Sequence, residues 1–295
     1  MVPYFVSFLP QVSMEENLPP YSPLDDPTVQ GLLRHAVGVL LPEYLTPSRY
    51  ANITRYARQW FPQLEGRFHS YGKSRQILLF RKLGVRHPES ILFETPAQLL
   101  TAFLQEGSPW GYPFVLKGDK GGGGSRVFPI RKPESLPRRV TQLPGNEPAL
   151  MQRWVEHGGK DLRVVVYGDH AVSYFRVGGG NFYNNVCRGG RIDHTGWPDL
   201  QEKGVRAVTA FCREARIDVA GFDLMFPDAG DPVFVEINFH FGRKGLGGSE
   251  GHRLHLRRAI EDWRRRCLRL FTEGGEGRGR VRVEATPATV SDLQS

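Results

Sequence analysis

Two carboxylates and one amide in neighbouring hydrophobic segments are the residues of this chain best suited to chemistry. Asp223 lies within VAGFDLMFP (219–227), and Glu236 and Asn238 lie within PVFVEINFH (232–240). The turn-forming DAGD between the segments predicts a β-hairpin, and strand alternation places Glu236 and Asn238 on one face. Three hard oxygen ligands suit Mg²⁺ and leave room for nucleotide phosphates. The alternative is a solvated hairpin, but carboxylates flanked by Phe, Val, Ile and Leu favour the metal site.

A glycine run provides a second candidate. GDKGGGGSR (118–126) follows Lys117 and separates two expected strands, PFVLK and VFPI. A Walker phosphate loop would need a following helix and a GK[ST] ending, so this is a different arrangement. Unobstructed backbone N–H groups can fold over phosphates, and Lys117 offers a point charge. A flexible hairpin turn is the alternative. Polyglycine alone is weak evidence for a phosphate site and becomes informative only together with the other motifs. The loop residues expected at the nucleotide are Gly122, Gly123, Gly124 and Ser125.

The elements that must position these residues follow from hydrophobic periodicity and breaker residues. Residues 1–30 are rich in proline, lack a period and predict a loop. The predicted helices are 48–62, 74–84, 95–107 with Thr95 as N-cap, 203–216, and 254–270 with Leu256, Ile260, Trp263, Cys267 and Leu270 on one stripe. The predicted strands are 36–45, 86–93, 113–117, 127–130, 149–156, 161–169, 171–177 and the two segments of the hairpin.

Composition describes an ordinary globular chain of 295 residues, 40% hydrophobic and 24% charged. No apolar run approaches the ~20 residues that span a bilayer. Cys187, Cys212 and Cys267 form neither a disulfide framework nor a zinc motif, so a reducing cytoplasm is expected. The net charge of +8 is partly local, with ten Arg against six Asp and Glu from His252 onward. Without a nucleic-acid module, this basic end predicts a solubilising tail, so neither nucleic acid nor membrane is an expected partner.

Five features follow one another along the chain in this order: Lys117, the glycine loop, MQRWVE, the DLR tripeptide and the acidic pair. In this order the chain resembles the ATP-grasp superfamily, and within it the RimK-type branch of ribosomal-protein glutamate ligases. The resemblance covers about 70–265 and is densest over 113–240, including DLRVVVYGDHAVSYFRV and NNVCRGG. It implies an α+β ATP-grasp fold, with two α+β subdomains clasping ATP behind a short N-terminal α/β unit. The implied parts are a truncated pre-ATP-grasp region (1–72) and an ATP-grasp domain (73–270) with a small lid subdomain (about 95–155) and a larger one (about 156–270). The last residues are poor in apolar side chains and predict a disordered tail (271–295).

The resemblance also implies roles for charged side chains. Lys117 matches a lysine that contacts nucleotide phosphate, and Lys73 resembles an earlier lysine near phosphate. Arg176 matches an arginine that points at phosphate or at an acyl-phosphate intermediate, so Arg176 and Lys117 are the expected catalytic residues. Two or more Mg²⁺ ions held by Glu236 would bridge the β- and γ-phosphates, with Mn²⁺ as an alternative metal. The alternative for Arg163 and Arg176 is that they only form ion pairs with surface acids. The alternative for Lys73 is that it is a solvated helix residue.

Further matches concern the base and ribose of the nucleotide. Arg153 and Trp154 fall at the hinge whose backbone reads adenine, and Glu156 is expected to face the ribose. The remaining matches are Asp161 and Arg163 in the motif that holds the nucleotide, Asn185 at the asparagine of the family's Arg-Ser-Asn, and Asp223, Glu236 and Asn238 as metal ligands. His157, His194, His240 and His252 have no metal-ligand spacing and are expected to be structural or on the substrate side.

The implied function is ATP- and Mg²⁺-dependent ligation of a small-molecule or peptide carboxylate to an amine through an acyl phosphate. An ATP-dependent kinase and a nucleotide-binding partner protein without turnover are the alternatives. One departure concerns the substrate, because the chain reads NFHFGRKGLGG where many relatives have a small residue and Pro-Gly. Arg243 and Lys244 in this loop would either bind an acidic acceptor or be exposed charges. The sequence leaves open a homo-oligomer or a protein partner.

Overall fold

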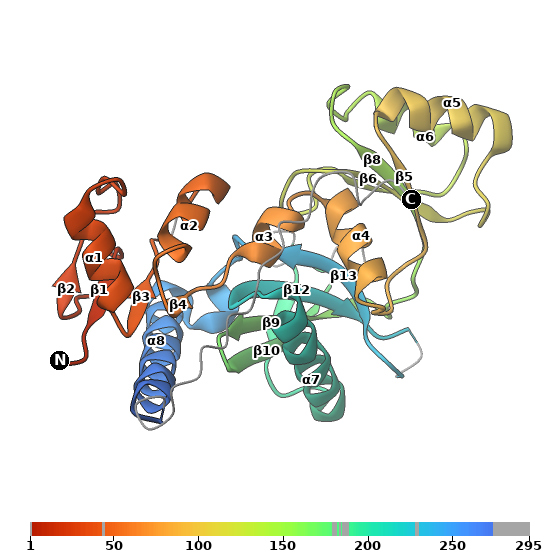
Figure 1. The fold of residues 1–295 in the computed structure, drawn as a ribbon. Coiled ribbons are helices and arrows are strands. Elements are labelled where there is room, and N and C mark those ends of the chain that lie inside the picture. Colours follow the sequence, from red (N-terminus) through yellow and green to blue (C-terminus); the bar gives the residue numbers. More distant parts are fainter. Residues whose placement is uncertain are drawn as a thin grey trace.

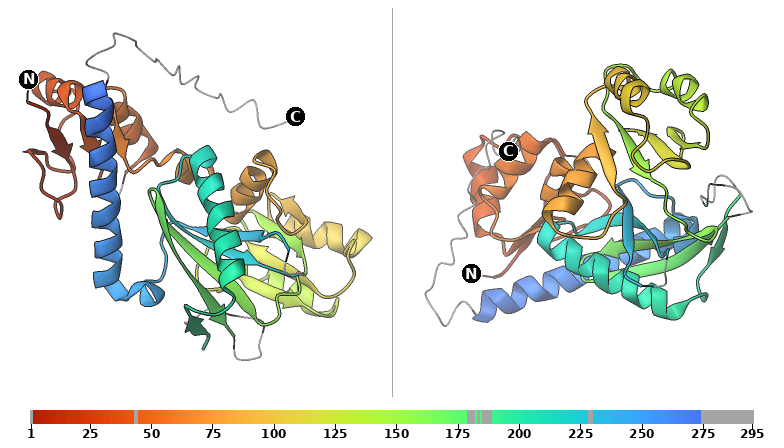
Figure 2. Two further views of the ribbon diagram at one scale, coloured as in Figure 1. Left: turned by 90° about the horizontal axis from the view of Figure 1, so that it is seen from below. Right: turned by 90° about the vertical axis from the view of Figure 1, so that its right-hand side faces the viewer.

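The computed structural model describes residues 2–42, 45–178, 182, 184, 189–227 and 230–273. Within them the chain forms three sheets, each with its own helices (Figure 1). We call them the leading sheet, the small sheet and the large sheet, in chain order. The small sheet with its helices stands apart from the leading sheet, and the large sheet lies between them (Figures 1 and 2).

The leading sheet corrects the prediction that residues 1–30 form a loop. Its four strands are parallel in the order β2-β1-β3-β4. Asp26 caps the first helix by accepting from the Thr28 N–H at 2.7 Å, with Pro27 at the first helical turn. The predicted helix over 48–62 ends at Thr54, and a strand follows. The elements are β1 (Phe5–Ser7), β2 (Glu16–Asn17), α1 (Pro27–His35), β3 (Gly38–Leu40), α2 (Pro47–Thr54), β4 (Trp60–Phe61) and α3 (Glu65–His69).

The small sheet is antiparallel, in the order β5-β8-β6-β7. One face packs against α5 and α6 through Leu99, Phe103, Leu136 and neighbouring strand residues. The Thr95 hydroxyl accepts from the Gln98 N–H at 3.2 Å, which confirms the predicted N-cap. The elements are β5 (Ser90–Phe93), α5 (Pro96–Glu106), β6 (Phe114–Gly118), β7 (Val127–Ile130), α6 (Ser135–Val140) and β8 (Ala149–Arg153).

The large sheet is antiparallel, in the order β11-β10-β9-β12-β13. On its central strand β9, Leu162, Val164 and Val166 pack with α7. On the opposite face the strand carries Asp161 and Arg163, followed by Val165 and Tyr167, which pack with α8. The elements are α4 (Lys73–Lys82), β9 (Lys160–Tyr167), β10 (His170–Val177), β11 (Arg191–Asp193), α7 (Pro198–Ala215), β12 (Val219–Met225), β13 (Val233–Asn238), the 3₁₀ turn η2 (Lys244–Leu246) and α8 (Gly248–Glu273).

The closing helix α8 joins the leading sheet to the large sheet. Ile260, Trp263 and Cys267 are buried in one cluster with Phe5 and Tyr167, which belong to the two sheets. The predicted stripe is therefore correct in its centre but wrong at Leu270, which is 51% exposed. The helix continues to Glu273, three residues beyond its predicted end. The rest of the predicted tail, 274–295, lies outside the described residues.

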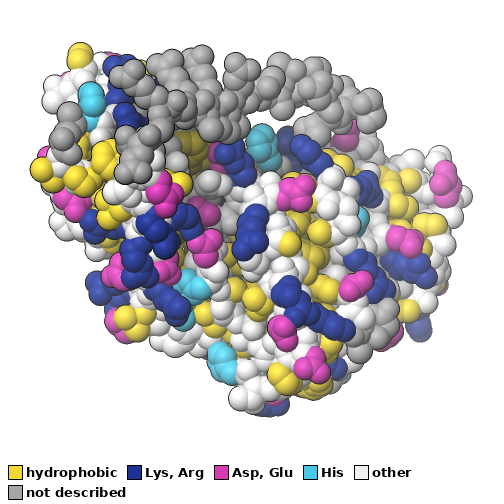
Figure 3. All heavy atoms as spheres, turned by 60° about the horizontal axis from the view of Figure 1, so that its bottom comes forward, with side chains coloured by type: hydrophobic (Ala, Val, Ile, Leu, Met, Phe, Trp, Pro, Cys, Tyr) yellow, Lys and Arg dark blue, Asp and Glu magenta, His cyan; other side chains and the backbone are white. Residues whose placement is uncertain are grey.

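The basic side chains of α8 are interspersed with acids. Arg264 pairs with Glu15 at 2.6 Å, and Arg253 and Arg266 pair with Glu250 and Asp169. On the face shown in Figure 3, Lys and Arg side chains likewise alternate with Asp and Glu. Among the helices of the described residues, none combines the length and apolarity of a membrane span.

Candidate active site

The predicted hairpin is present, and it brings the two carboxylates together. Asp223 on β12 lies opposite Glu236 on β13, next to a β-bulge between Asp223 and Leu224. Asn238, two residues further on, has its Nδ2 at 3.3 Å from Asp223 Oδ2. Opposite residues of antiparallel strands share a face, so all three side chains belong to one site.

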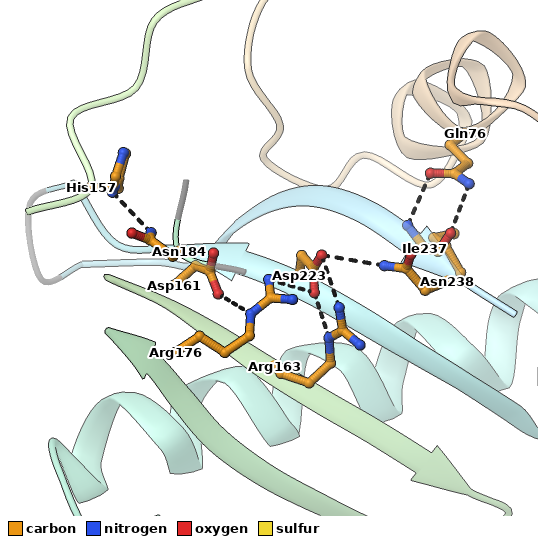
Figure 4. A network of polar contacts seen from close by, with 9 residues as sticks. All are labelled: Gln76, His157, Asp161, Arg163, Arg176, Asn184, Asp223, Ile237 and Asn238. Carbon is orange, nitrogen blue, oxygen red and sulfur yellow. Dashed lines mark hydrogen bonds and ion pairs between the residues drawn. The ribbon is translucent and has the colours of Figure 1, made fainter. Parts of the chain in front are cut away.

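Cross-strand register also places two arginines in this site (Figure 4). Arg163 lies opposite Asp223 and binds it through Nε–Oδ1 at 2.5 Å and Nη2–Oδ2 at 3.2 Å. Arg176 lies opposite Asp161, with Nε–Oδ1 at 2.6 Å, and its Nη2 reaches Asp223 Oδ1 at 3.1 Å. All four side chains are buried, so the alternative of surface ion pairs is wrong.

The four charged groups are coupled electrostatically, and burial raises the pKa of Asp161 although Arg176 favours its ionised form. Burial works against the ionised form of Asp223, but Arg163 and Arg176 outweigh it and lower the pKa of this carboxyl. Asp223 and Asp161 in turn raise the pKa of Arg176, against the effect of burial. Buried charges need such partners, because an unpaired ion in this environment is strongly unfavourable. The network therefore presents a fixed arrangement of guanidinium groups on the polar face of the large sheet.

Glu236 faces the two lysines that the sequence selected. Lys73 Nζ lies 3.1 Å from Glu236 Oε1 and donates to the Gly121 carbonyl at 3.1 Å. Lys73 is buried, so the solvated alternative is wrong for this residue. Burial lowers the pKa of Lys117 to about 8, with Glu236 opposing this shift and Lys73 adding to it. Lys117 thus carries a readily removed proton next to a second ammonium group.

The donor set fits a hard divalent cation. Glu236 retains 25% side-chain exposure while it forms an ion pair with Lys73. Both oxygens of Asp223 already accept from Arg163, Arg176 or Asn238. Carboxylate and amide oxygens are ligands that Mg²⁺ prefers. Glu236 and Asn238 are therefore the accessible ligands, and Asp223 would coordinate only through an oxygen that also accepts from an arginine.

Two clefts meet at this network. The first is lined by Lys117, Gly124 and Trp154, and the second by Gly122 and Gly123. Both share Arg176, Asp223 and Glu236. The glycine loop therefore extends along both clefts, from β6 of the small sheet to the polar face of the large sheet. The remaining residues of the second cleft are Arg163, Tyr174, Ile192, Asn238, His240, Phe241, Gly242, Lys244 and Gly245.

Other predicted residues have different positions. Arg153 lines the first cleft together with Trp154, but its side chain is 57% exposed and pairs with Glu89 at 2.8 Å. Glu156 is exposed and accepts from Trp154 Nε1 at 2.8 Å, and Ser125 is exposed and lines neither cleft. Asn185 lies outside the described residues.

Some of the histidines and of the two loop cations Arg243 and Lys244 line the clefts, and the others lie elsewhere. His157 lines the first cleft, and His240 and Lys244 line the second. His252 is structural, because its Nδ1 lies 2.7 Å from the hydroxyl of Tyr167 under α8. The other residues of these predictions, His194 and Arg243, line neither cleft.

The apolar wall of the first cleft was missed from sequence. Its signal was present, because Val115 lies two residues from Lys117 and Met225 two residues from Asp223, on the same strand faces. Asn184 was missed as well; it is 3% exposed, its Nδ2 lies 3.2 Å from His157 Nδ1, and its Oδ1 has no hydrogen-bond partner among the residues that the structure describes. The other apolar residues of this wall are Pro88, Val127, Val155, Phe182 and Val235, and the polar Gln152 also lines the cleft.

Comparisons with known proteins agree with this arrangement. The chain is 32% identical over 142 residues to N-acetylaspartylglutamate synthase A of Homo sapiens, covering 47% of this chain and 36% of that protein. It is 30% identical over 189 residues to a probable alpha-L-glutamate ligase of Parasynechococcus marenigrum, covering 61% and 39%. The chain thus spans less than half the length of the curated relatives it matches.

Solved structures show the same fold. D-alanine–D-alanine ligase from Bacillus anthracis in complex with ATP superposes with a TM-score of 0.56 at 15% identity, covering 88% of this chain and 87% of that one. The RimK domain ATP-grasp protein from Sphaerobacter thermophilus gives 0.53 at 18% identity, covering 77% and 81%. The expected α+β ATP-grasp fold is confirmed. A model of the RimK-like ATP-grasp domain matches residues 70–254. The chain belongs to the RimK-like ATP-grasp family.

Proposed function

We propose that the protein is an ATP- and Mg²⁺-dependent ligase that joins a carboxylate to an amine. In this reaction the carboxylate accepts the γ-phosphoryl group of ATP, and the amine then displaces phosphate from the acyl phosphate to form an amide. The observation that carries the proposal is the meeting of two clefts at Arg176, Asp223 and Glu236. One cleft suits the nucleotide and the other the two remaining substrates, with the reacting groups at their junction.

The first cleft has the properties of a nucleotide site. Its apolar wall, including Val115, Val127 and Met225, suits a flat heterocycle, and the Oδ1 of Asn184 offers a buried acceptor. Lys117 and the backbone of the glycine loop lie where the phosphates would follow. Several hydrogen-bond donors that converge on phosphate oxygens, as these residues would, strengthen the binding of a nucleotide.

At the junction the residues divide their work by charge. Glu236 and Asn238 would hold Mg²⁺, which when bound neutralises the phosphate oxygens. Arg176 is held by Asp161 and Asp223, so its guanidinium is already oriented toward charge that develops on the transferred phosphoryl group. The glycine loop excludes water from an acyl phosphate that would otherwise hydrolyse. No nucleophilic side chain is required.

Transfer of ¹⁸O tests the reaction directly. Carboxylates labelled with ¹⁸O would be incubated with the protein, ATP, Mg²⁺ and L-glutamate as amine. The acids would be N-acetylaspartate, citrate and glutamate-terminated peptides, chosen from the names of the relatives. We expect one ¹⁸O in the released phosphate and an amide product by mass spectrometry. A kinase would instead leave phosphate on the product, and a binding protein would release neither ADP nor phosphate.

The pKa of Lys117 leads to a second expected result. With a pKa of about 8, this side chain is about half neutral at pH 8 in the free protein. Phosphates near its Nζ favour the charged form and raise the pKa, so binding takes up protons. We expect uptake of about half a proton when Mg·ADP binds at pH 8, measured by calorimetry in buffers of different ionisation enthalpy. At pH 6.5, where Lys117 is already charged, the uptake falls toward zero.

Lys117→Met serves as the control for this measurement. At pH 8 the binding enthalpy of the wild type should depend on the ionisation enthalpy of the buffer, because Lys117 takes up a proton. In Lys117→Met this dependence is expected to be smaller, because the titrating amine is absent. Equal proton uptake in both proteins at pH 8 would show that Lys117 does not face the phosphates.

A further inference from the structure

A buried glutamine outside both clefts contacts the metal-site strand. Gln76 on α4 is 7% exposed, and its side-chain amide forms two hydrogen bonds to the backbone of Ile237 (Figure 4). Nε2 donates to the Ile237 carbonyl at 2.9 Å, and the Ile237 N–H donates to Oε1 at 2.9 Å. One side chain thus satisfies both backbone groups of this residue.

The position of Ile237 gives this contact its consequence. β13 is an edge strand of the large sheet, so the backbone groups that point away from β12 have no neighbouring strand. The amide of Gln76 takes the place of that strand at Ile237. Glu236 and Asn238 flank Ile237, and their side chains project from the strand face opposite to that of Ile237. The directions of both side chains therefore depend on the backbone conformation at Ile237. Gln76 holds that backbone at its midpoint.

The N-terminal end of the same helix is attached to the glycine loop. Gly72 provides no side-chain cap for α4. Instead, Asp119 at the start of the loop accepts from Lys73 N through its carbonyl at 2.9 Å and from Ser74 N through Oδ1 at 2.8 Å. A Cβ on Gly72 would lie 2.1 Å from Asp119 Oδ2, so the close approach requires glycine. α4 therefore connects the small sheet to β13.

Lys73 lies in this helix one turn before Gln76. Since Lys73 Nζ contacts Glu236 at 3.1 Å, the hydrogen bonds of Gln76 fix the strand that carries its partner. The distance between Lys73 Nζ and Glu236 is therefore set by the helix α4, which is anchored at Asp119 and at Ile237, and not by the ion pair alone. A long lysine side chain held in this way loses less freedom when a ligand arrives.

We propose that Gln76 is a positioning residue for the divalent-metal site, acting through Ile237 on Glu236 and Asn238. The inference rests on the proposed function. It predicts that removing the amide weakens the effect of Mg²⁺ on nucleotide binding without weakening nucleotide binding itself. Outer groups that orient metal ligands typically contribute about 10- to 100-fold to metal affinity.

Gln76→Met tests this role by binding and exchange, without turnover. ADP affinity would be measured by calorimetry in Mg²⁺ and in EDTA, and exchange of the Ile237 amide by hydrogen–deuterium methods. We expect the ratio of the two ADP affinities to shrink about tenfold, the affinity in EDTA to stay at the wild-type value, and Ile237 to lose protection. Gln201→Met is the matched control, because Gln201 is a buried glutamine that bonds Ser173 and the His194 carbonyl on the α7 side. It is expected to leave the ratio and Ile237 unchanged.

Gln76→Glu keeps the shape and supplies the test should Gln76→Met fold poorly. A carboxylate can accept from the Ile237 N–H but repels its carbonyl, whereas the protonated acid restores both hydrogen bonds. Relative to the wild type at the same pH, the Mg²⁺ effect in this variant is expected to recover as the pH falls from 8 to 5.5.

The outcomes separate the two proposals. A normal Mg²⁺ effect in Gln76→Met, or an equal loss in Gln201→Met, would overturn the positioning role and leave the proposed function standing. A Gln76→Glu variant whose Mg²⁺ effect does not change with pH relative to the wild type would also overturn the role. A wild-type protein whose ADP affinity is the same in Mg²⁺ and in EDTA would overturn both.

Discussion

Replacing Glu236 by glutamine is expected to lower turnover about a thousandfold while leaving the protein folded. Glutamine has the same shape, but it removes the accessible anion of the metal site and the charge that faces Lys73 and Lys117. The buried Lys73 loses its carboxylate partner, but its Nζ still donates to the Gly121 carbonyl and can donate to the new amide oxygen, so the protein should stay folded with a lowered thermal midpoint. Turnover would be measured as amide formation at saturating ATP over a range of Mg²⁺ concentrations.

Glu15→Gln provides the comparison for Glu236→Gln. Glu15 pairs with Arg264 at 2.6 Å in the leading unit and touches neither cleft. Its replacement removes one carboxylate from an ion pair and is expected to leave turnover at the wild-type value. A Glu236→Gln protein that turns over at the wild-type rate would remove the metal assignment, and with it the division of roles at the junction.

Arg176→Met is expected to reduce both stability and turnover, for separate reasons. Asp161 and part of Asp223 would be left buried without their partner, which costs about 3–5 kcal/mol of unfolding free energy. The loss of a positioned guanidinium at the phosphoryl group is expected to lower turnover by a further factor of about 100 to 1,000. Denaturant unfolding measures the first effect, and amide formation at low temperature measures the second.

A second substitution separates these two effects. Asp161→Asn in the Arg176→Met background removes the unpaired acid, so most of the lost stability should return. Turnover should remain low, because the guanidinium is still missing. Recovery of turnover together with stability would mean that Arg176 only neutralises Asp161 and has no part in the chemistry.

The sequence predicted the β12–β13 hairpin because its information is local. A turn separates two short, mainly apolar segments typical of strands, so Asp223 and Glu236 were expected to lie near each other. The Asp161–Arg176 pair belongs to a hairpin of the same local kind, β9–β10. The Arg163–Asp223 pair was not predictable in this way, because it follows from the register of β9 with β12, which joins segments about 60 residues apart. Periodicity within one segment carries no information on such a register.

The predicted strand over 36–45 contains β3, but β1 and β2 of the leading sheet were missed for a related reason. β1 has three residues and β2 two, too few to show alternation, and β1 pairs in parallel with β3 across the helix α1. The helix α1 did have a signal, since Asp26 and Pro27 form a standard N-terminus, but the prolines around it concealed it. Short parallel strands are recognised mainly through tertiary packing.

Gln76 illustrates what sequence could not provide at the site. Its position in a basic helix is typical of an exposed polar residue, and only the packing of α4 against β13 buries it. The same holds for Asp119, whose capping partner lies 45 residues away. Residue types identified the groups that could bind phosphate and metal, whereas the groups that hold them in place required the fold.

A crystal structure with Mg²⁺ and a non-hydrolysable ATP analogue would show whether the nucleotide and the metal bind where we propose. We expect the base against Val115 and Met225, the phosphates at Lys73 and Lys117, and Mg²⁺ bound by Glu236 and Asn238. A nucleotide bound outside the first cleft, or Mg²⁺ bound without contact to Glu236, would contradict this arrangement.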